Sequence, residues 1–359
     1  MSGNGHILNP WDFASAFTAS GVIDPGDTLL LRGGTYTGNL TPTIQGQAGK
    51  LITIAAYPGE VPIINGNITG GSYLRFRDLI ITDTGFTDRS AANSTDGITV
   101  GEGCEYLYCI VKNHNQGFAG GNLLTTYKIH GCQVYYNGWD AILGHGLYVQ
   151  HQGTADKVYL TNNIVGFNFA WGFHIYGSNI LRKFYLEKNV SFQNGVIRAA
   201  AQPNIMVGGA AGIADPEFYG NRTWHAGNDA DGIRVNFGAG NPATGVILSN
   251  GNFCVGSGAL RLVDNPTITT LSGNYFYGAL EPSTIATDYP NNTYGTFANT
   301  PDTVFLDALE DVARANLTIY NKQAQANTVN VDVSSLFGQT GTVKAYNAQD
   351  ITNDIQILE

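Results

Sequence analysis

One short pattern recurs along the middle of this chain: an asparagine followed at once by a short apolar stretch. Its successive copies are separated by 26, 32, 31 and 22 residues. Its asparagines are Asn163, Asn189, Asn221, Asn252 and Asn274. Cys109 and Cys132 take the same place upstream, 23 residues apart. An irregular period of this length is typical of a solenoid, in which each repeat forms one coil and stacks on its neighbours.

A second column follows five residues further on in each repeat. Its members are His114, Asn137, Asn168, Asn194, Ala226 and Ser257. Stacked amides can hydrogen-bond from one coil to the next, so we interpret the asparagines as structural ladders. The composition agrees with this reading, because 46 glycines and only 13% charged residues are typical of short strands joined by tight turns.

The N-terminal part of the chain carries a more specific signature. The stretch 25–36 reads PGDTLLLRGGTY, and 51–66 reads LITIAAYPGEVPIING. Together with residues 9–24 before it, this block resembles the N-terminal coils of β-helical polysaccharide lyases of the pectate-lyase-like superfamily. It is especially similar to the alginate lyase and chondroitinase B branch. The resemblance implies a right-handed parallel β-helix, and the repeat extends it to about residue 280.

We therefore predict an all-β chain in three parts. Residues 1–24 form an N-terminal cap with a short helix over 9–20, which Asn9 caps and which covers the exposed end of the strands. Residues 25–300 form the parallel β-helix. Residues 301–359 form a small antiparallel β appendage, with strands at 315–320, 327–333 and 341–346. This appendage is expected to pack on the solenoid or to cap its C-terminal end.

A column of apolar–x–apolar trios precedes the asparagine-led strands. Because side chains alternate along a strand, the central residues should project outward, one above another about 4.8 Å apart. This outward row is Thr99, Tyr148, His174, Met206, Arg234 and Arg261. Positions two before or one after a trio lie on the same face, and they add Asp96, His145, Trp171, Asp231, Gln150, Tyr176 and Asn236.

The outward face is rich in His, Tyr, Trp and Arg, whereas a solvated β face normally carries Thr, Ser, Lys and Glu. Aromatic rings suit the apolar faces of sugars, and arginine suits a carboxylate or a sulfate. We interpret the face as a site for a polysaccharide that is acidic. The catalytic candidates are His174, Tyr148, Arg234 and Asp231. The substrate-binding candidates are His145, Trp171, Tyr176, Arg261, Gln150 and Asn236.

The favoured reaction is β-elimination on a uronic acid, which requires a neutralised carboxylate, a base and an acid. Arg234 or Arg261 would neutralise the carboxylate, and His174 is a plausible base because its ordinary pKa lies near neutrality. Tyr148 or Tyr176 would be the acid. Uronate C5-epimerisation begins with the same proton removal, so the sequence does not separate the two reactions.

Two alternatives remain at this point. Glycoside hydrolysis requires paired carboxyls, for which Asp231 with Asp229 or Asp140 qualifies. A non-catalytic solenoid of the phage-tail or adhesin type would bind glycans without cleaving them. We favour the lyase because the row offers His, Tyr and Arg more firmly than paired acids.

Cofactors and partners follow from the same residues. The resemblance implies a Lys and Arg pair with acidic calcium ligands, but the outward row contains no Lys and no acidic cluster arranged for Ca²⁺. No cofactor is firmly implied, and Ca²⁺ stays an alternative. A net charge of −10 argues against a broad nucleic-acid surface, and no apolar run reaches the length of a membrane span. No oligomeric state is predicted.

The place of action and the cysteines complete the expectations. The first residues show no signal peptide, but a protein that acts on polysaccharides is expected to be secreted or extracellular. Four cysteines are too few for a disulfide scaffold. Cys109 and Cys132 should stack on adjacent coils, and we expect them to be buried thiols.

Overall fold

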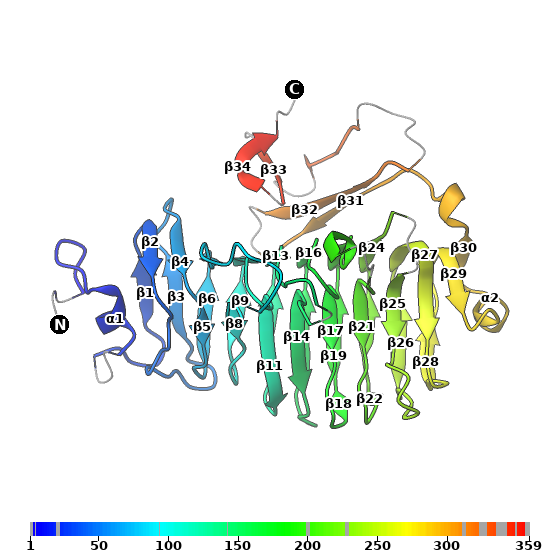
Figure 1. The fold of residues 1–359 in the computed structure, drawn as a ribbon, viewed down its shortest axis with the longest axis horizontal. Coiled ribbons are helices and arrows are strands. Elements are labelled where there is room, and N and C mark those ends of the chain that lie inside the picture. Colours follow the sequence, from blue (N-terminus) through cyan, green and yellow to red (C-terminus); the bar gives the residue numbers. More distant parts are fainter. Residues whose placement is uncertain are drawn as a thin grey trace.

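A computed structural model shows an elongated stack of coils whose strands run parallel, which is a parallel β-helix (Figure 1). Most coils contribute a strand to each of three faces. The fold class predicted from the repeat is thereby confirmed. The structure describes residues 3, 5–18, 22–92, 94–141, 143–198, 202–226, 230–310, 314–322, 329–334, 343–348 and 350–355.

The first face is a ten-stranded parallel sheet. Its inward side chains, such as Ile54 and Phe76, are fully buried in one continuous core. In order, its strands are β1 (Thr28–Leu31), β3 (Ile52–Ala56), β6 (Leu74–Arg77), β9 (Glu105–Leu107), β12 (Lys128–His130), β15 (Val158–Thr161), β19 (Phe184–Glu187), β23 (Glu217–Tyr219), β26 (Val246–Ser249) and β28 (Ile268–Leu271).

The second face begins directly after the first asparagine column. Its strands are β2 (Gly34–Thr37), β4 (Pro62–Asn65), β7 (Ile80–Thr82), β10 (Ile110–Lys112), β13 (Gln133–Tyr135), β16 (Ile164–Gly166), β20 (Val190–Phe192), β24 (Arg222–Trp224), the start of β27 (Phe253–Leu262), the start of β29 (Tyr275–Glu281) and β30 (Thr293–Gly295). The turn between the first and second faces is the ladder corner.

The asparagine ladder at this corner is confirmed. The amide nitrogen of Asn189 donates to Oδ1 of Asn221 at 2.9 Å, and Asn221 donates in turn to Asn252 at 2.9 Å. Each amide also donates to a carbonyl of the preceding coil, as Asn221 does to Leu186 at 3.0 Å. The ladder extends one step beyond the predicted column, to Asn292. Each buried amide in it is therefore satisfied from both sides.

The second column is a shorter ladder than its sequence alignment implies. Asn137 donates to Asn168 at 3.1 Å, and Asn168 donates to Asn194 at 3.0 Å. Asn194 then donates to Oδ1 of Asn204 at 2.9 Å instead of reaching the next coil. The reason is chemical, because Ala226, the next member of the column, has no amide to accept the bond.

The third face is the column that contains the outward row. Glycines such as Gly172 precede its strands, and a Cβ on Gly172 would lie 2.5 Å from the carbonyl oxygen of Asn204. Its strands are β5 (Ile68–Thr69), β8 (Ile98–Thr99), β11 (Phe118–Leu123), β14 (Leu147–His151), β17 (Phe173–Ile175), β21 (Ile205–Val207), β25 (Asp231–Val235) and the ends of β27 and β29. A small side sheet joins β18 (Leu181–Arg182) to β22 (Ile213–Ala214).

The N-terminal end of the stack is covered as predicted, but by a shorter helix. The helix α1 spans only Phe13–Ala16, and Asp12 rather than Asn9 caps it, since the Asp12 carboxylate accepts the Ser15 backbone N–H at 2.9 Å. Residues 19 and 20 of the predicted helix lie outside the described residues. Phe17 is buried against the core, so this segment closes the open end.

The C-terminal end of the stack is closed by α2 (Ile285–Asp288) and β30, with η2 (Phe297–Asn299) after them (Figure 1). Ile285 belongs to the buried core. A further short helix, η1 (Val196–Arg198), lies in the turn before β21. The appendage therefore has no part in capping this end among the residues described.

The appendage begins with an antiparallel hairpin of β31 (Thr303–Ala308) and β32 (Ala315–Tyr320). It lies lengthwise along the ladder corner (Figure 1). Near its tip, Arg314 pairs with Asp78, and at its base the Tyr320 hydroxyl donates to the Thr223 carbonyl at 3.1 Å. Of the two placements left open by the sequence, the structure has packing along the side.

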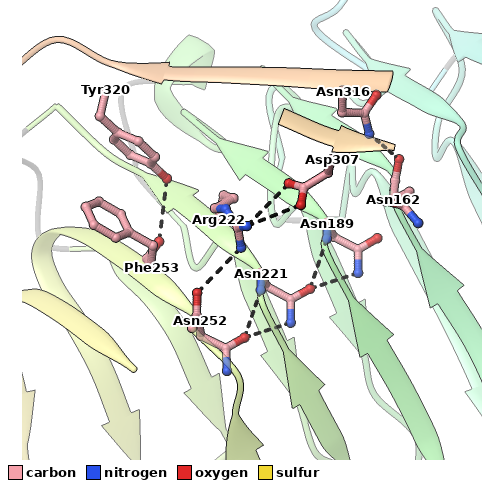
Figure 2. Close-up of polar contacts among 10 residues, drawn as sticks. Asn162, Asn189, Asn221, Arg222, Asn252, Phe253, Asp307, Asn316 and Tyr320 are labelled. Atoms are coloured by element: carbon pink, nitrogen blue, oxygen red, sulfur yellow. Dashed lines mark hydrogen bonds and ion pairs between the residues drawn. The ribbon is translucent and has the colours of Figure 1, made fainter. Parts of the chain in front are cut away.

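A buried ion pair anchors the hairpin near the tip end of its strands. Arg222 of β24 lies 3.3 Å from Asp307 of β31, and both side chains are less than a tenth exposed. Figure 2 shows this pair beside the ladder, together with the Asn316 amide that donates to the Asn162 carbonyl at 2.6 Å. The hairpin is thus held on the ladder corner by an ion pair and by side-chain hydrogen bonds.

The remaining predicted strands are partly corrected. Residues 329–333 form no strand, and 327 and 328 lie outside the described residues. The last predicted strand corresponds to β33 (Ala345–Asn347), which pairs antiparallel with β34 (Asp350–Ile355). The period-two pattern at 327–333 fails because no neighbouring strand pairs with the described part of it.

Two further expectations concern the cysteines and membranes. All four cysteines are buried free thiols, and strand register places Cys109 and Cys132 side by side, as expected. Among the described residues, no helix is both long and apolar enough to cross a membrane.

Candidate functional site

The outward row exists in the register that the sequence predicts. Tyr148 pairs with His174, His174 with Met206, and Arg234 with Arg261 on successive strands of the third face. The prediction missed one coil, because Ala119 of β11 stands between Thr99 and Tyr148. It also missed the next residue beyond Arg261, which is Glu281 of β29.

The middle of the row is covered rather than open to solvent. Met206 is fully buried, and His174 is only 7% exposed. The expectation that every central residue faces solvent is therefore wrong for these two. The cause is the aromatic rings of the flanking positions, which pack over the row at this point.

An aromatic cluster forms this cover. The ring of Trp171 lies edge-on to that of His174, with centroids 3.5 Å apart. Tyr176 stacks on His174 at 5.3 Å, and Tyr148 lies 5.2 Å from it on the other coil. His174 is thus enclosed by three of the residues selected from the sequence, while Tyr148 and Tyr176 keep partial exposure.

His145 joins the cluster from the coil that contains Tyr148. Its Nε2 lies 3.0 Å from Nδ1 of His174, and its Nδ1 accepts the backbone N–H of Trp171 at 3.4 Å. Burial lowers the pKa of His145 to about 3. Burial also holds the pKa of His174 well below its ordinary value, helped by the nearby His145 and the positive charge of Arg234. Both rings are therefore neutral at physiological pH.

The next coils along the third face are charged. Arg234 donates to the Phe237 carbonyl at 3.0 Å, and Arg261 pairs with Glu281 at 3.0 Å. Burial raises the pKa of Asp231, against the lowering effect of both arginines. Burial lowers the pKa of Arg234, and the charge of Arg261 lowers it further. The guanidinium groups of Arg234 and Arg261 lie near the partly buried Asp231 and the exposed Glu281, and they make this end of the site suited to an anion.

Two of the substrate-binding candidates have different positions. Gln150 lies beside Tyr148, since its side chain hydrogen-bonds the phenol. Asn236 is fully buried and donates to the Asp264 carboxylate at 2.8 Å and to the Asn241 carbonyl at 2.5 Å. The structure thus places Asn236 inside a turn and not on the open face.

The acidic candidates are not brought together as a pair. Asp140 lies in a long turn, where its exposed carboxylate pairs with Arg198 at 3.6 Å. Asp229 lies outside the described residues. Asp96 is partly buried, and this burial raises the pKa of its carboxyl. The carboxylate whose charge raises the pKa of Asp231 is that of Glu281.

Two contributors were not apparent from the sequence. Phe237 packs on Tyr176 with centroids 4.7 Å apart, and Gln202 accepts a hydrogen bond from the Trp171 indole N–H. The backbone of Asn236 has a φ of 72°, which turns the chain where Phe237 joins the cluster. An asparagine directly after a strand tolerates this conformation well, so it was the one available signal.

Metal binding was an alternative raised by the resemblance. Within the described part of the chain, no three His, Cys, Asp or Glu side chains gather closely enough to hold an ion. Asp83 is engaged by Ser94 at 2.6 Å and by the Gly85 backbone at 2.9 Å.

Comparison with known proteins identifies neighbours by fold. No protein-family model matches the chain, and no curated protein matches it. The chain is similar to the crystal structure of pectate lyase Pel9A, with a TM-score of 0.53, 16% identity, and coverage of 72% of this chain and 75% of that one. It is also similar to an alginate lyase from Paenibacillus sp. strain FPU-7, with a TM-score of 0.50, 17% identity, and coverage of 80% and 96%. These likenesses show a shared parallel β-helix fold.

Proposed function

We propose that this protein is a polysaccharide lyase that cleaves a uronic-acid-containing polysaccharide by β-elimination on the third face. The observation that supports this most is the sequence of side chains along consecutive coils. An aromatic cluster around His174 passes directly into a charged group built on Arg234 and Arg261. A sugar chain lying along the stack would meet rings that suit its apolar faces, then guanidinium groups that suit its carboxylates.

The proposed reaction balances without a co-reactant. A base takes the proton from C5 of the uronate, the electrons left at C5 form the C4=C5 double bond, and the C4–O4 bond breaks. O4 leaves with a proton from an acid of the site. Arg234 neutralises the carboxylate so that the C5 proton becomes acidic enough to remove. The phenol of Tyr148 is assigned as the acid, because burial raises its pKa and keeps it protonated.

The two structural neighbours support this class of substrate by their chemistry. One neighbour is a pectate lyase and the other is an alginate lyase. Both pectate and alginate are polyuronates. The proposal for this chain depends on its own residues, because the identities of 16% and 17% are too low to transfer a mechanism. If the substrate is polysaccharide outside the cell, the protein would act there.

One observation favours hydrolysis as a second candidate. Asp231 is a partly buried carboxyl with a raised pKa, and the charge of Glu281 raises it further. A carboxyl with a raised pKa close to a second carboxylate is the arrangement of a glycosidase acid. Against this, Glu281 is engaged with Arg261 at 3.0 Å.

The test is a screen of the purified protein against alginate, pectin, glycosaminoglycans and bacterial exopolysaccharides. Ultraviolet absorbance of the conjugated 4,5-unsaturated uronate and formation of new reducing ends are followed together. Elimination predicts a rise in both signals. Reducing ends without absorbance would identify a hydrolase, and glycan binding without either signal would identify a binding module.

A further inference from the structure

A chain of three hydrogen-bonding groups runs through the aromatic cluster. It begins at the backbone N–H of Trp171, which donates to Nδ1 of His145 at 3.4 Å. It continues from Nε2 of His145 to Nδ1 of His174 at 3.0 Å. It ends at Nε2 of His174, which is buried and has no hydrogen-bond partner among the residues that the structure describes.

The first member of this chain fixes the protons of the other two. A backbone N–H can only donate, so Nδ1 of His145 must be the bare nitrogen of its ring. A neutral imidazole has one N–H, and in His145 this hydrogen must therefore be on Nε2. That N–H donates to Nδ1 of His174, which is consequently bare as well. The single N–H of neutral His174 must then be on Nε2.

We propose that His174 presents a fixed Nε2–H donor to an anionic oxygen of the bound polysaccharide and does not take the C5 proton. This inference deepens the proposed function and depends on it for the identity of the ligand. It reverses the role expected from the sequence, in which His174 is the base. An anion at this place is also favoured by Arg234, whose positive charge acts on the His174 ring.

The geometry excludes the alternative directly. To accept a proton, Nε2 of His174 must be bare, which moves the ring hydrogen to Nδ1. Nε2 of His145 must then accept, and its own hydrogen moves to Nδ1, where it faces the Trp171 N–H. Two donors would meet in a buried, apolar setting, so the network holds His174 in the donating form. The C5 proton is left to another side chain of the third face.

The burial of His174 explains why its Nε2–H favours the binding of an acceptor. Its ring is 7% exposed, and it lies among Trp171, Tyr148 and Tyr176, which offer Nε2 no acceptor. A buried donor without a partner is unfavourable in the free protein. A carboxylate or sulfate oxygen entering beside Tyr148 and Tyr176 would supply the missing acceptor, so the free protein is prepared for an anionic ligand.

The first test is NMR of the full-length protein labelled with ¹⁵N. Two-bond couplings between ring protons and nitrogens identify the protonated nitrogen of each histidine, and the His174→Gln spectrum assigns the His174 signals. The proposal predicts Nε2–H on both His145 and His174 at neutral pH. A hydrogen on Nδ1 of His174, or a charged ring, would overturn it. This outcome does not depend on any enzymatic activity, so it is separate from the proposed function.

The second test compares His174→Gln with His174→Asn on the polyuronate that the wild type degrades. The Gln amide nitrogen reaches the place of Nε2 and keeps the donor, whereas the Asn amide stops at the place of Nδ1. The elimination rate should fall by no more than about tenfold in His174→Gln and by about a hundredfold or more in His174→Asn. Equal, complete loss in both variants, with native circular dichroism, would indicate a base and contradict the proposal.

Discussion

The ladder corner and the third face are built from the same coils, yet their buried polar side chains differ in what they meet. At the ladder corner, the Asn221 amide both donates to and accepts from its neighbours, and Arg222 meets Asp307 within the docked hairpin, although the Nε of Arg222 has no partner among the described residues. On the third face, Nε2 of His174 and Nε of Arg234 are buried without a partner among the described residues. The ladder amides are therefore satisfied within the fold, whereas the unmet groups of the third face lie on the face proposed to bind the substrate.

This difference separates stability from function. Satisfied buried amides specify the register of the stack, and their removal exposes unpaired groups elsewhere in the ladder. Unmet donors stabilise nothing in the free protein, and on the third face a bound ligand could satisfy them, whereas the docked hairpin already covers the Nε of Arg222. The two unmet groups of the third face are donors, and the ligand that would satisfy them is an anion.

The largest expected effect is a loss of stability at low pH, because neutral histidines are buried in both regions. Burial lowers the pKa of His114 and His225 to about 4 and that of His145 to about 3, and it depresses that of His174. The unfolded chain, with pKa values near 6.5, binds more protons below that pH. Stability should be complete above about pH 6.5 and fall toward pH 4, by up to about 1.4 kcal/mol per pH unit for each ring.

Urea unfolding from about pH 7 to about pH 5 measures this effect. The substitution His225→Gln should flatten the dependence by one ring. A stability that does not vary across this range would show that these histidines are not held neutral.

The second expected effect concerns the unmet donors. Arg234→Met should lower the elimination rate about a hundredfold to a thousandfold, because the uronate carboxylate would lose its neutralising charge. Its free energy of unfolding should fall by only about 1 kcal/mol, because the bond to the Phe237 carbonyl is lost while the Nε has no partner to lose among the described residues. Steady-state rates and urea midpoints check both parts. Arg75→Met on the first face, where Arg75 pairs with Glu105, is the matched control.

The third effect is on the ladder. Asn221→Ala leaves the Asn189 amide, the Asn189 backbone N–H and the Leu186 carbonyl without their partner. The free energy of unfolding should fall by about 3 kcal/mol, as expected for several buried groups left unsatisfied. Asn291→Ala, at an exposed position outside the ladder, should change it by less than about 0.5 kcal/mol. Similar urea midpoints for the two variants would mean that the ladder adds no stability.

The smallest effect concerns the contacts that hold the hairpin on the ladder corner. Tyr320→Phe removes the hydroxyl that donates to the Thr223 carbonyl at 3.1 Å but keeps the ring against Phe253. We expect a loss of about 1 kcal/mol, seen as faster proteolysis within the hairpin. Unchanged proteolysis would indicate that the ring contacts alone hold the hairpin in place.

The periodic part of this structure could be predicted because its rules are local. An asparagine at each coil start and an apolar–x–apolar trio were sufficient to find the ladder and to place Tyr148 next to His174 in register. The coil that contains Ala119 was missed because its small residues give no alternation to detect.

The parts that escaped prediction depend on contacts without a period. Arg222 and Asp307 are 85 positions apart, and no repeat connects them. The burial of His174 depends on Trp171 and Tyr176 folding over the strand, which alternation alone does not reveal. The donating role of His174 depends on one backbone N–H, that of Trp171, and only coordinates show its direction.

The proposed function requires that the third face, and not the ladder corner, binds an acidic polysaccharide. The most direct measurement is the ultraviolet rate of elimination for Arg234→Met and Arg75→Met beside the wild type, on the polyuronate that the wild type degrades. Arg234→Met should lose nearly all of the elimination rate, while Arg75→Met should keep it. Full elimination by a folded Arg234→Met protein would contradict the assignment of the site to the third face.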